Sequence, residues 1–169
     1  YVPWNSPVDN EAKRRGCSVY LVDRVLPMLP ERLCNDVCSL RPGVDRLCMS
    51  VVMRLDRRGN VTDAQAFPTA IRSAARLDYD TVDALLEGRV DAAGLPCAPD
   101  AAPRVAEAIA VLDQVAALRI ARRAERGAID FDTREARVRL GERGVPTGVE
   151  VRRKTRATSL VEEAMLIAN

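Results

Sequence analysis

Residues 17–30 read CSVYLVDRVLPMLP and join a strand pattern to a rigid loop. Residues 18–22 are rich in β-branched and aromatic side chains, which favour an extended strand. Pro27 and Pro30 then frame a methionine and a leucine, and proline is excluded from the middle of a central strand. The stretch therefore predicts a strand that carries Tyr20 and leads into a stiff, apolar, proline-framed loop.

The composition is that of a globular protein that can form one domain. The chain has 169 residues, of which 47% are hydrophobic and 30% are charged. No apolar run approaches the ~20 residues of a membrane span, and the first ten residues, YVPWNSPVDN, lack the pattern of a signal peptide. Because the chain begins at Tyr1 rather than at a methionine, we expect it to be a piece of a longer polypeptide.

Cysteine and histidine usage limits the possible chemistry. The chain has five cysteines and no histidine. An odd number of cysteines without a disulfide-framework spacing predicts reduced thiols and a cytoplasmic protein. Cys34 and Cys38 could face one side of a helix as a metal pair, but no second pair follows at zinc-site spacing, so we predict no metal site in this chain. The absence of histidine excludes Ser-His-Asp and Cys-His catalysis from it.

Arginine supplies almost all of the positive charge. The net charge is +2, and Lys13 and Lys154 are the only lysines in the sequence. Arginine makes forked contacts that suit phosphate and carboxylate groups, although an arginine- and alanine-rich genome is the simpler explanation for its abundance. The basic clusters at residues 13–15 and 152–154 are candidate phosphate contacts, and Arg15 is chosen as a substrate-binding candidate.

Helical and strand patterns alternate along the chain. Helices are expected over residues 7–15, 30–40, 80–86, 103–126 and 158–169, and hairpins over residues 47–67 and 136–151. In the first hairpin, alternation places the side chains of Leu47, Met49, Val51, Met53 and Leu55 on one half-buried face. These patterns predict an α+β fold in which a mixed or antiparallel sheet packs with helices.

The helix expected over residues 103–126 is the longest. Its apolar stripe comprises Val105, Ile109, Leu112 and Val115. Its last turns carry four arginines, at positions 119, 122, 123 and 126. Positive side chains complement the partial negative charge of a helix C-terminus. We favour that interpretation, together with solvated charge, over RNA contacts.

The last helix carries two adjacent carboxylates on an otherwise apolar segment. Ser159 and Glu162 have the spacing of a capping box, in which the acid satisfies a backbone N–H at the helix start. Glu162 can therefore be a capping residue or the carboxylate of a functional site. Both interpretations stay open at this point.

The residues at 18–49, SVYLVDRVLPMLPERLCNDVCSLRPGVDRLCM, closely resemble the central stretch of the RNB catalytic domain of bacterial ribonuclease R and ribonuclease II. YVPWNSPVDNEAKRRG, RGAIDFDTREARVRL and ATSLVEEAMLIAN resemble flanking blocks of that domain in the same order. The sequence resembles ribonuclease R more closely than ribonuclease II. The resemblance implies that residues 1–169 are part of an RNB catalytic domain.

The resemblance implies a 3′-to-5′ processive exoribonuclease that hydrolyses single-stranded RNA to nucleoside 5′-monophosphates. Tyr20 matches a tyrosine that stacks at the 3′-terminal nucleotide and helps to set the final product length. Phe131 matches an aromatic residue that packs on the RNA, and Glu162 matches a glutamate that holds the terminal ribose or base. We therefore expect Tyr20 and Glu162 in the catalytic pocket and Phe131 among the substrate-binding residues.

Physical chemistry supports these roles. Stacking on an aromatic ring contributes ~1–3 kcal/mol per base without sequence preference. A carboxylate can accept hydrogen bonds from ribose hydroxyls, and the 2′-OH distinguishes RNA from DNA. Arg24 follows Tyr20 by four residues, so a continuous strand would place both side chains on one face, with Arg24 free to meet a phosphate.

Other parts of the family's machinery do not match this sequence. The resemblance implies that Mg²⁺ is held by an Asp-rich block expected before Tyr1 and that a catalytic arginine is expected beyond Asn169. Asp130 and Asp132 belong to a different block and are interpreted as surface carboxylates. We therefore expect the isolated chain to be inactive and to form the wall that grips the RNA 3′ end. The alternatives are a non-catalytic RNA-binding or regulatory module and a plain α+β interaction domain.

The expected partner is single-stranded RNA, with no membrane partner. The sequence identifies no partner among RNA-degradation or ribosome-associated proteins.

Overall fold

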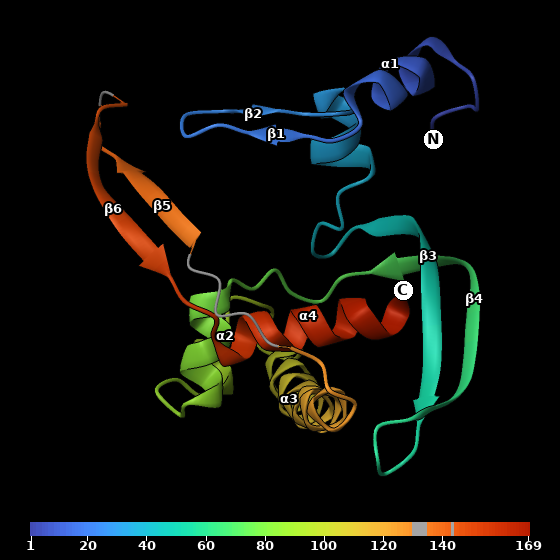
Figure 1. Cartoon of the computed structure of the whole chain (residues 1–169), viewed down its shortest axis with the longest axis vertical. Coiled ribbons are helices and arrows are strands. Elements are labelled where there is room, and N and C mark those ends of the chain that lie inside the picture. The colour runs from blue at the N-terminus through green and yellow to red at the C-terminus, as the bar shows by residue number, and fades with distance from the viewer. Residues whose placement is uncertain (130–134, 143) are drawn as a thin grey trace. The chain divides into compact units, whose positions relative to one another are not determined.

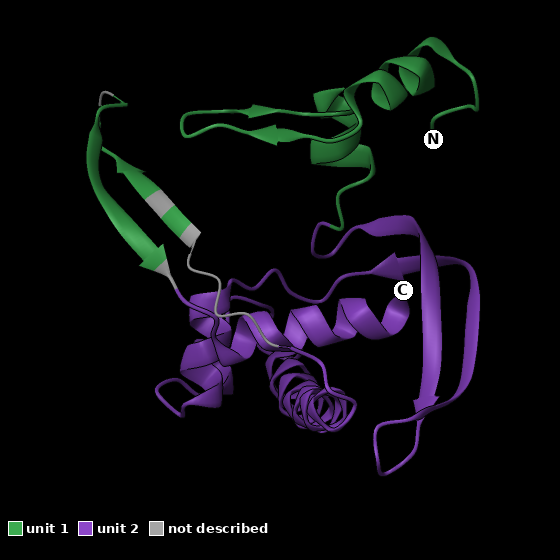
Figure 2. Cartoon of the chain, in the orientation of Figure 1, with its two compact units in different colours: residues 1–40, 134–152 green, residues 41–133, 153–169 purple. Residues whose placement is uncertain are grey.

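The computed structural model describes residues 1–129, 135–142 and 144–169. Helices and antiparallel hairpins alternate along the chain (Figure 1), which confirms the α+β class. The chain divides into two compact units (Figure 2). Unit 1 comprises residues 1–40 and 134–152, and unit 2 comprises residues 41–133 and 153–169.

Unit 1 begins with helix α1, Pro7–Arg15, as the sequence predicts. The Ser6 hydroxyl caps it by accepting a hydrogen bond from the Asp9 N–H at 3.3 Å. Gly16 ends the helix with a φ of 71°, which glycine adopts without strain. Local capping chemistry therefore fixes both ends of this helix.

A small hairpin follows α1. Strands β1, Val19–Tyr20, and β2, Val25–Leu26, pair antiparallel, with Tyr20 opposite Val25. The turn is closed by the Leu21 N–H, which donates to the Arg24 carbonyl at 2.8 Å. The expectation that one continuous strand carries Tyr20 and Arg24 is therefore wrong. Reversing the chain after Tyr20 pairs backbone groups locally that an extended strand would have left without a partner.

The rest of unit 1 contains a helical turn and a second hairpin. The helix expected over residues 30–40 is present as the short π-helix η1, Leu33–Val37, preceded by a helical turn. Strands β5, Glu135–Leu140, and β6, Pro146–Arg152, pair antiparallel, which confirms the predicted second hairpin.

Unit 2 begins with a long two-stranded ribbon. Strands β3, Asp45–Leu55, and β4, Val61–Arg72, pair antiparallel, which confirms the first predicted hairpin and extends it. The prediction of a half-buried face is wrong at its start, since Leu47 is 69% exposed and Met49 is 67% exposed. The alternation places these side chains on one face, but no other layer of the described chain covers the start of that face, whereas Met53 and Leu55 at its other end are half-buried.

Three helices form the core of unit 2 (Figure 1). They are α2, Tyr79–Leu86, α3, Ala102–Glu125, and α4, Arg156–Ala168, and each packs against the other two. The buried centre contains Ile109 and Ala116 of α3 and Leu160 of α4.

Helix α3 and the loop that precedes it each differ in one detail from the sequence prediction. Leu112 is 43% exposed, because the buried stripe of α3 continues from Ile109 to Ala116, two turns later, and leaves Leu112 at its edge. The loop expected over residues 89–103 includes a 3₁₀ turn, η2, Ala92–Gly94.

Among the described helices, none has the length and apolar character needed to cross a membrane.

Candidate functional site

Helix α4 starts earlier than the sequence predicts, and this changes the role of Glu162. Thr155 is the N-cap, and its side chain and that of Thr158 form a reciprocal capping box. The Thr155 N–H donates to Thr158 Oγ1 at 2.8 Å, and the Thr158 N–H donates to Thr155 Oγ1 at 3.3 Å. The predicted capping box of Ser159 and Glu162 is therefore wrong. Glu162 lies in the second turn, where its carboxylate is not needed for capping.

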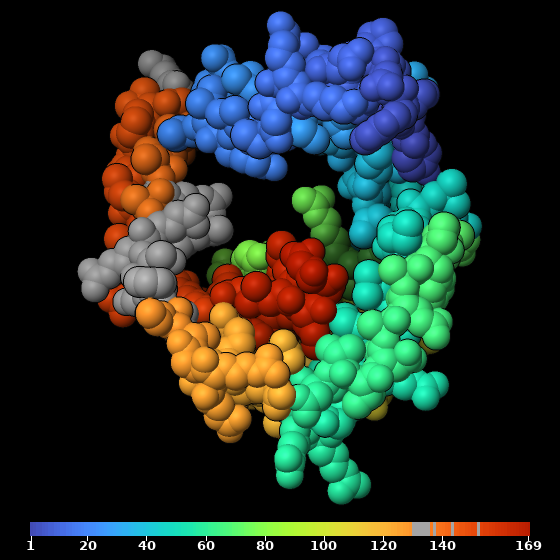
Figure 3. Space-filling view, turned by 45° about the vertical axis from the view of Figure 1, so that its right-hand side comes forward, coloured from blue at the N-terminus to red at the C-terminus, as the bar shows by residue number. Residues whose placement is uncertain are grey.

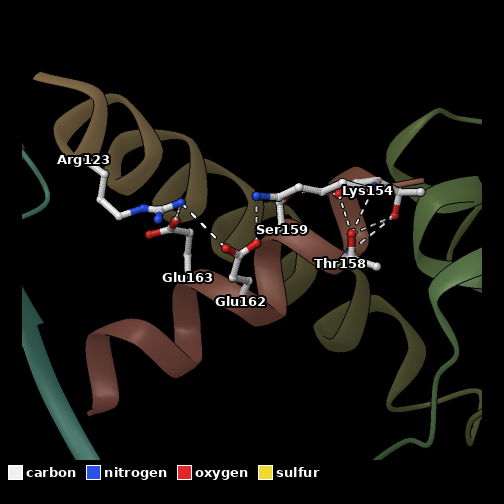
Figure 4. A network of polar contacts seen from close by, with 7 residues as sticks. Arg123, Lys154, Thr158, Ser159, Glu162 and Glu163 are labelled. Carbon is white, nitrogen blue, oxygen red and sulfur yellow. Dashed lines mark hydrogen bonds and ion pairs between the residues drawn. The ribbon is translucent and has the colours of Figure 1, made fainter. Parts of the chain in front are cut away.

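Two cations hold the Glu162 carboxylate (Figure 4). Lys154 Nζ lies 2.8 Å from Glu162 Oε2, and Arg123 Nη2 lies 3.8 Å from Glu162 Oε1. The side chain is nonetheless 41% exposed. Glu162 thus combines a fixed position with an acceptor surface that a ligand can reach.

Glu163 is the buried neighbour of Glu162 and shares its cation. Only 2% of Glu163 is exposed. Arg123 Nη2 lies 2.8 Å from Glu163 Oε1 (Figure 4), but the contact lacks hydrogen-bond geometry, and neither carboxylate oxygen accepts a hydrogen bond within the described chain. A buried charge is costly unless it is paired. Arg123 is therefore the counter-ion that joins α3 to both glutamates of α4.

The sequence pattern alone did not predict this role of Arg123. The signal was present in α4, because Glu163 follows Ala157 and Leu160 at helical spacing and so lies on the face that packs against the core. A carboxylate on such a face requires a cation from a neighbouring element. The last turns of α3 offered several arginines, and the pattern alone does not select Arg123.

Further contacts fix the start of α4 against α2 and α3. Arg156 Nη2 lies 2.5 Å from Asp113 Oδ2, and Arg156 Nη1 donates to the Leu86 carbonyl at 3.2 Å. The hydrogen bonds that Arg156 donates to the Asp113 carboxylate raise the pKa of the guanidinium above its usual value. The Ala157 N–H donates to Asp83 Oδ1 at 2.9 Å. These contacts hold the helix that presents Glu162.

The environment of Tyr20 differs from that of Glu162. It lies on the two-residue strand β1 and is 78% exposed. No hydrogen bond engages its hydroxyl within the residues that the structure describes. An exposed ring on a hairpin offers a flat face for stacking.

The proline-framed loop of the same unit is tied down at two points. The Met28 N–H donates to Ser18 Oγ at 2.9 Å, and Arg15 Nη1 donates to the Pro27 carbonyl at 2.8 Å. Between α1 and this loop lies a hollow of about 410 Å³, with Val8 and Leu29 among its lining residues. These contacts support the expectation that the loop is stiff.

Arg15 is itself partly engaged by this packing. Its Nε lies 2.8 Å from Glu11 Oε1, in addition to the contact with the loop, and the side chain remains 48% exposed. Lys13, in the same basic cluster, pairs with Asp9 at 2.6 Å and lies 4.3 Å from the centre of the Trp4 ring. The first basic cluster is therefore largely occupied by contacts within α1 and its flanks.

The other predicted site residues lie in unit 1 or outside the described residues. Arg24 lies in the turn between β1 and β2 and pairs loosely with Asp23 at 3.8 Å. Phe131, like Asp130 and Asp132, lies outside the described residues. Tyr20, Arg15 and Arg24 belong to unit 1, whereas Glu162 belongs to unit 2.

The described residues do not include a metal centre. No group of three or more Cys, Asp or Glu side chains in the described part of the chain could hold a metal ion. Three residues of unit 2 define what its site can do: Glu162 can accept hydrogen bonds, and Arg123 and Lys154 hold it in place.

Comparisons with known proteins match the chain from end to end. The model of the RNB domain family matches residues 1–169. Ribonuclease R 1 of Lactococcus lactis subsp. lactis is 42% identical over 171 residues, which cover 100% of this chain and 20% of that protein. DIS3-like exonuclease 2 of Schizosaccharomyces pombe is 37% identical over 173 residues, which cover 100% of this chain and 19% of that protein.

A solved structure has the same fold. Mycoplasma genitalium RNase R in complex with ribose-methylated single-stranded RNA aligns with a TM-score of 0.88 and 30% sequence identity. The alignment covers 100% of this chain and 25% of that one. The chain thus spans about a fifth of the length of these two relatives and a quarter of this solved structure.

Proposed function

The chain belongs to the RNB domain family, and we propose that it is the segment of a 3′-to-5′ exoribonuclease that grips the 3′ end of single-stranded RNA. The observation that carries this proposal is the 42% identity to a ribonuclease R over the whole chain. The placement of Tyr20 and Glu162 in the resembling blocks supports it. An exposed ring and a partly exposed, fixed carboxylate suit those two positions.

The proposed reaction is hydrolysis of the last phosphodiester bond of the RNA. Oxygen from water forms a bond to phosphorus, the bond from phosphorus to the 3′-oxygen of the preceding nucleotide breaks, and that oxygen takes up a proton. The released product is a nucleoside 5′-monophosphate. Repetition without release of the RNA makes the reaction processive.

Tyr20 is proposed to stack on the terminal base. A base has a π face whatever its identity, so the ring provides ~1–3 kcal/mol of grip without sequence preference. The ring is 78% exposed, which leaves its face available. Phe131 is proposed to pack on the RNA at the same end, and Arg15 and Arg24 are proposed to meet its phosphates.

Glu162 is proposed to accept hydrogen bonds from the ribose hydroxyls of the terminal nucleotide. Lys154 and Arg123 fix the carboxylate on α4, so that little freedom is lost when the ribose binds. Because the 2′-OH exists only in RNA, this contact would favour RNA over DNA. Glu162 would thus position the substrate rather than transfer a proton.

Mg²⁺ is the proposed cofactor of the full-length enzyme. Metal ions in such reactions supply an activated water and neutralise charge on the phosphate oxygens. The described residues do not fit this ion, because no carboxylate cluster among them could hold it. We propose that its ligands belong to other parts of the full-length protein and that the isolated chain is inactive.

The proposed compartment is the cytoplasm. All five cysteines are free thiols. Free thiols are typical of a reducing compartment. Single-stranded RNA is the proposed partner there.

The full-length protein that contains this chain should be incubated with Mg²⁺ and a 5′-labelled single-stranded RNA. We expect progressive shortening from the 3′ end, and a 3′-labelled copy should release its label as a mononucleotide at once. Cleavage at internal positions would contradict the proposal. Binding without any shortening would instead favour the non-catalytic RNA-binding module.

A further inference from the structure

The turn between β3 and β4 is held against α3. Arg119 Nη1 donates to the Gly59 carbonyl at 2.9 Å. Gly59 is buried at a φ of 73°, and a Cβ added to it would lie 3.4 Å from the Cβ of Leu118. The teal surface of the turn accordingly lies beside the orange surface of the last turns of α3 (Figure 3). A turn 60 residues away in sequence thus has a defined position at this helix end.

The turn is also braced from within. The Asp56 carboxylate accepts hydrogen bonds from the Arg58 N–H at 2.8 Å, the Asn60 N–H at 2.9 Å and Asn60 Nδ2 at 2.7 Å. The hydrogen bonds from Asn60 lower the pKa of Asp56 below its usual value, and the positive charge of Arg122 contributes to the same shift. Asp56 therefore stabilises the turn, and Arg122 of α3 is close enough to interact electrostatically with the Asp56 carboxylate.

This arrangement places side by side two segments that each carry arginines. Arg57 and Arg58 belong to the turn, and Arg122 and Arg126 belong to the end of α3. Within the part of the chain that the structure describes, no ion pair or side-chain hydrogen bond engages these four groups. We call them the turn–helix arginine cluster. The carboxylates in these segments are Asp56, already used by the turn, and Glu125.

Complementing the helix dipole does not explain this cluster. A helix C-terminus accounts for Arg122 and Arg126, which the sequence alone places there. It does not account for two arginines on a turn that tertiary packing brings to the same end. Two other exposed arginines of unit 2, Arg72 and Arg89, pair with carboxylates at 2.6 Å and 2.5 Å.

We propose that the turn–helix arginine cluster binds the phosphodiester backbone of the RNA away from its 3′ end. Guanidinium groups make forked, charge-assisted hydrogen bonds to phosphate oxygens. A braced turn and a helix end present them at low cost in lost conformational freedom. The inference rests on the proposed function, because it supplies the polyanion. It adds a second contact surface that is independent of Tyr20 and Glu162.

Such contacts have a measurable electrostatic signature. Each phosphate neutralised on a single strand steepens the decrease of log K with log salt by about 0.7. One lost contact therefore weakens binding about fivefold at about 0.1 M salt. The effect is confined to RNAs long enough to reach the cluster.

The test uses the full-length protein and unmodified single-stranded RNA, with EDTA in place of Mg²⁺, so that the RNA keeps its 2′-OH groups and is bound without being cleaved. Binding of a short oligomer that fills only the terminal pocket is compared with binding of one several times longer. With Arg57→Ala/Arg58→Ala, affinity for the long RNA should fall about 25-fold at about 0.1 M salt, and the salt slope should become shallower by about 1.4. Affinity for the short RNA should not change.

A matched control removes the same charge elsewhere. Arg76 and Arg104 are exposed, and no ion pair engages them within the described residues. Arg104 lies about 27 Å along α3 from Arg122, at 1.5 Å per residue. Arg76→Ala/Arg104→Ala should leave binding of both RNAs unchanged. Arg57→Lys/Arg58→Lys should restore most of the salt slope, because the charge is retained.

The outcomes separate the two proposals. If the wild-type protein binds both RNAs and Arg57→Ala/Arg58→Ala binds them equally well, the cluster proposal is overturned and the proposed function stands. Equal losses in the cluster variant and the control would also overturn it, since net charge alone would then explain the effect. If the wild-type protein binds neither RNA, the proposed function and the cluster both fail.

Discussion

Tyr20 and Glu162 are held in opposite ways. Tyr20 projects from a two-residue strand and is 78% exposed, with its position set by the backbone of a small hairpin. Glu162 lies on a helix whose start and whose charged groups are tied to α2 and α3. A stacking ring needs an open face, whereas a hydrogen-bonding carboxylate needs a fixed direction. The exposed hairpin therefore suits the stacking role proposed for Tyr20, and the fixed helix suits the hydrogen-bonding role proposed for Glu162.

The comparison predicts that the two regions respond differently to mutation. Substitutions around Glu162 should alter both stability and substrate recognition, because the residues that hold it also hold the core. Substitutions at Tyr20 should alter recognition alone.

Arg123→Ala should have the largest effect on stability. It leaves the carboxylate of Glu163, which is 2% exposed, without its cation. Removal of one partner from a buried pair costs about 3–5 kcal/mol, and the partial exposure of Arg123 favours the lower end. Hydrogen exchange of α3 and α4 in the full-length protein should report the loss.

A paired variant and a control sharpen that result. Arg123→Met/Glu163→Leu removes both charges and should recover most of the stability. Arg122→Ala removes an adjacent arginine without an ion pair and should change stability by less than about 0.5 kcal/mol. Equal losses for Arg122→Ala and Arg123→Ala would contradict the assigned role of Arg123.

Glu162→Ala should reduce discrimination between RNA and DNA. Loss of a hydrogen bond to a charged group costs about 1.5–3 kcal/mol, so binding of a short RNA should weaken about tenfold or more. Binding of the same sequence as DNA should change much less, because the 2′-OH is absent. Glu107→Ala, an exposed carboxylate of α3, provides the control. An equal loss for RNA and DNA would exclude a contact between Glu162 and the 2′-OH of the ribose.

Gly59→Ala should loosen the turn from α3. The left-handed φ of 73° costs an alanine about 1–2 kcal/mol, and the added methyl group would touch Leu118. Hydrogen exchange should increase in the turn while α2 stays protected. Gly88→Ala, at the same φ but with no atom within 4 Å of the added Cβ, separates backbone strain from loss of the contact with α3. Similar exchange in the β3–β4 turn for both variants would contradict the docking of this turn on Leu118.

Asp78→Asn should have the smallest effect, and only in acid. The hydrogen bond from the Thr81 N–H lowers the pKa of Asp78, the N-cap of α2. A carboxyl with a lowered folded-state pKa stabilises the fold above its unfolded pKa of about 3.9, and this contribution disappears as pH falls through the folded-state value. The wild-type protein should therefore lose stability relative to Asp78→Asn in that window. A constant difference in urea midpoint across the same pH range would exclude the cap as the cause.

The sequence predicted what depends on local chemistry. The first helix followed from Ser6, Pro7 and Gly16, and both long hairpins followed from alternation and turn residues. The resemblance also identified the family correctly.

What it could not predict depends on partners distant in sequence. The turn after Tyr20 replaces an extended strand because β2 offers a closer pairing partner. Glu162 is not a cap, because Thr155 begins the helix earlier and both threonines satisfy its first N–H groups. The pairing of Arg123 with Glu163 joins two helices, and no local pattern specifies it.

The grip of Tyr20 on the RNA 3′ end is measured by the length of the final product from a 5′-labelled single-stranded RNA. The full-length wild-type protein is compared with Tyr20→Phe and Tyr20→Ala. Tyr20→Phe keeps the ring and should stop at the wild-type length. Tyr20→Ala loses ~1–3 kcal/mol of stacking at the terminal base, so the RNA should dissociate earlier and leave a longer product. If Tyr20→Ala and the wild-type protein stop at the same length, Tyr20 does not grip the 3′ end, and the account is contradicted.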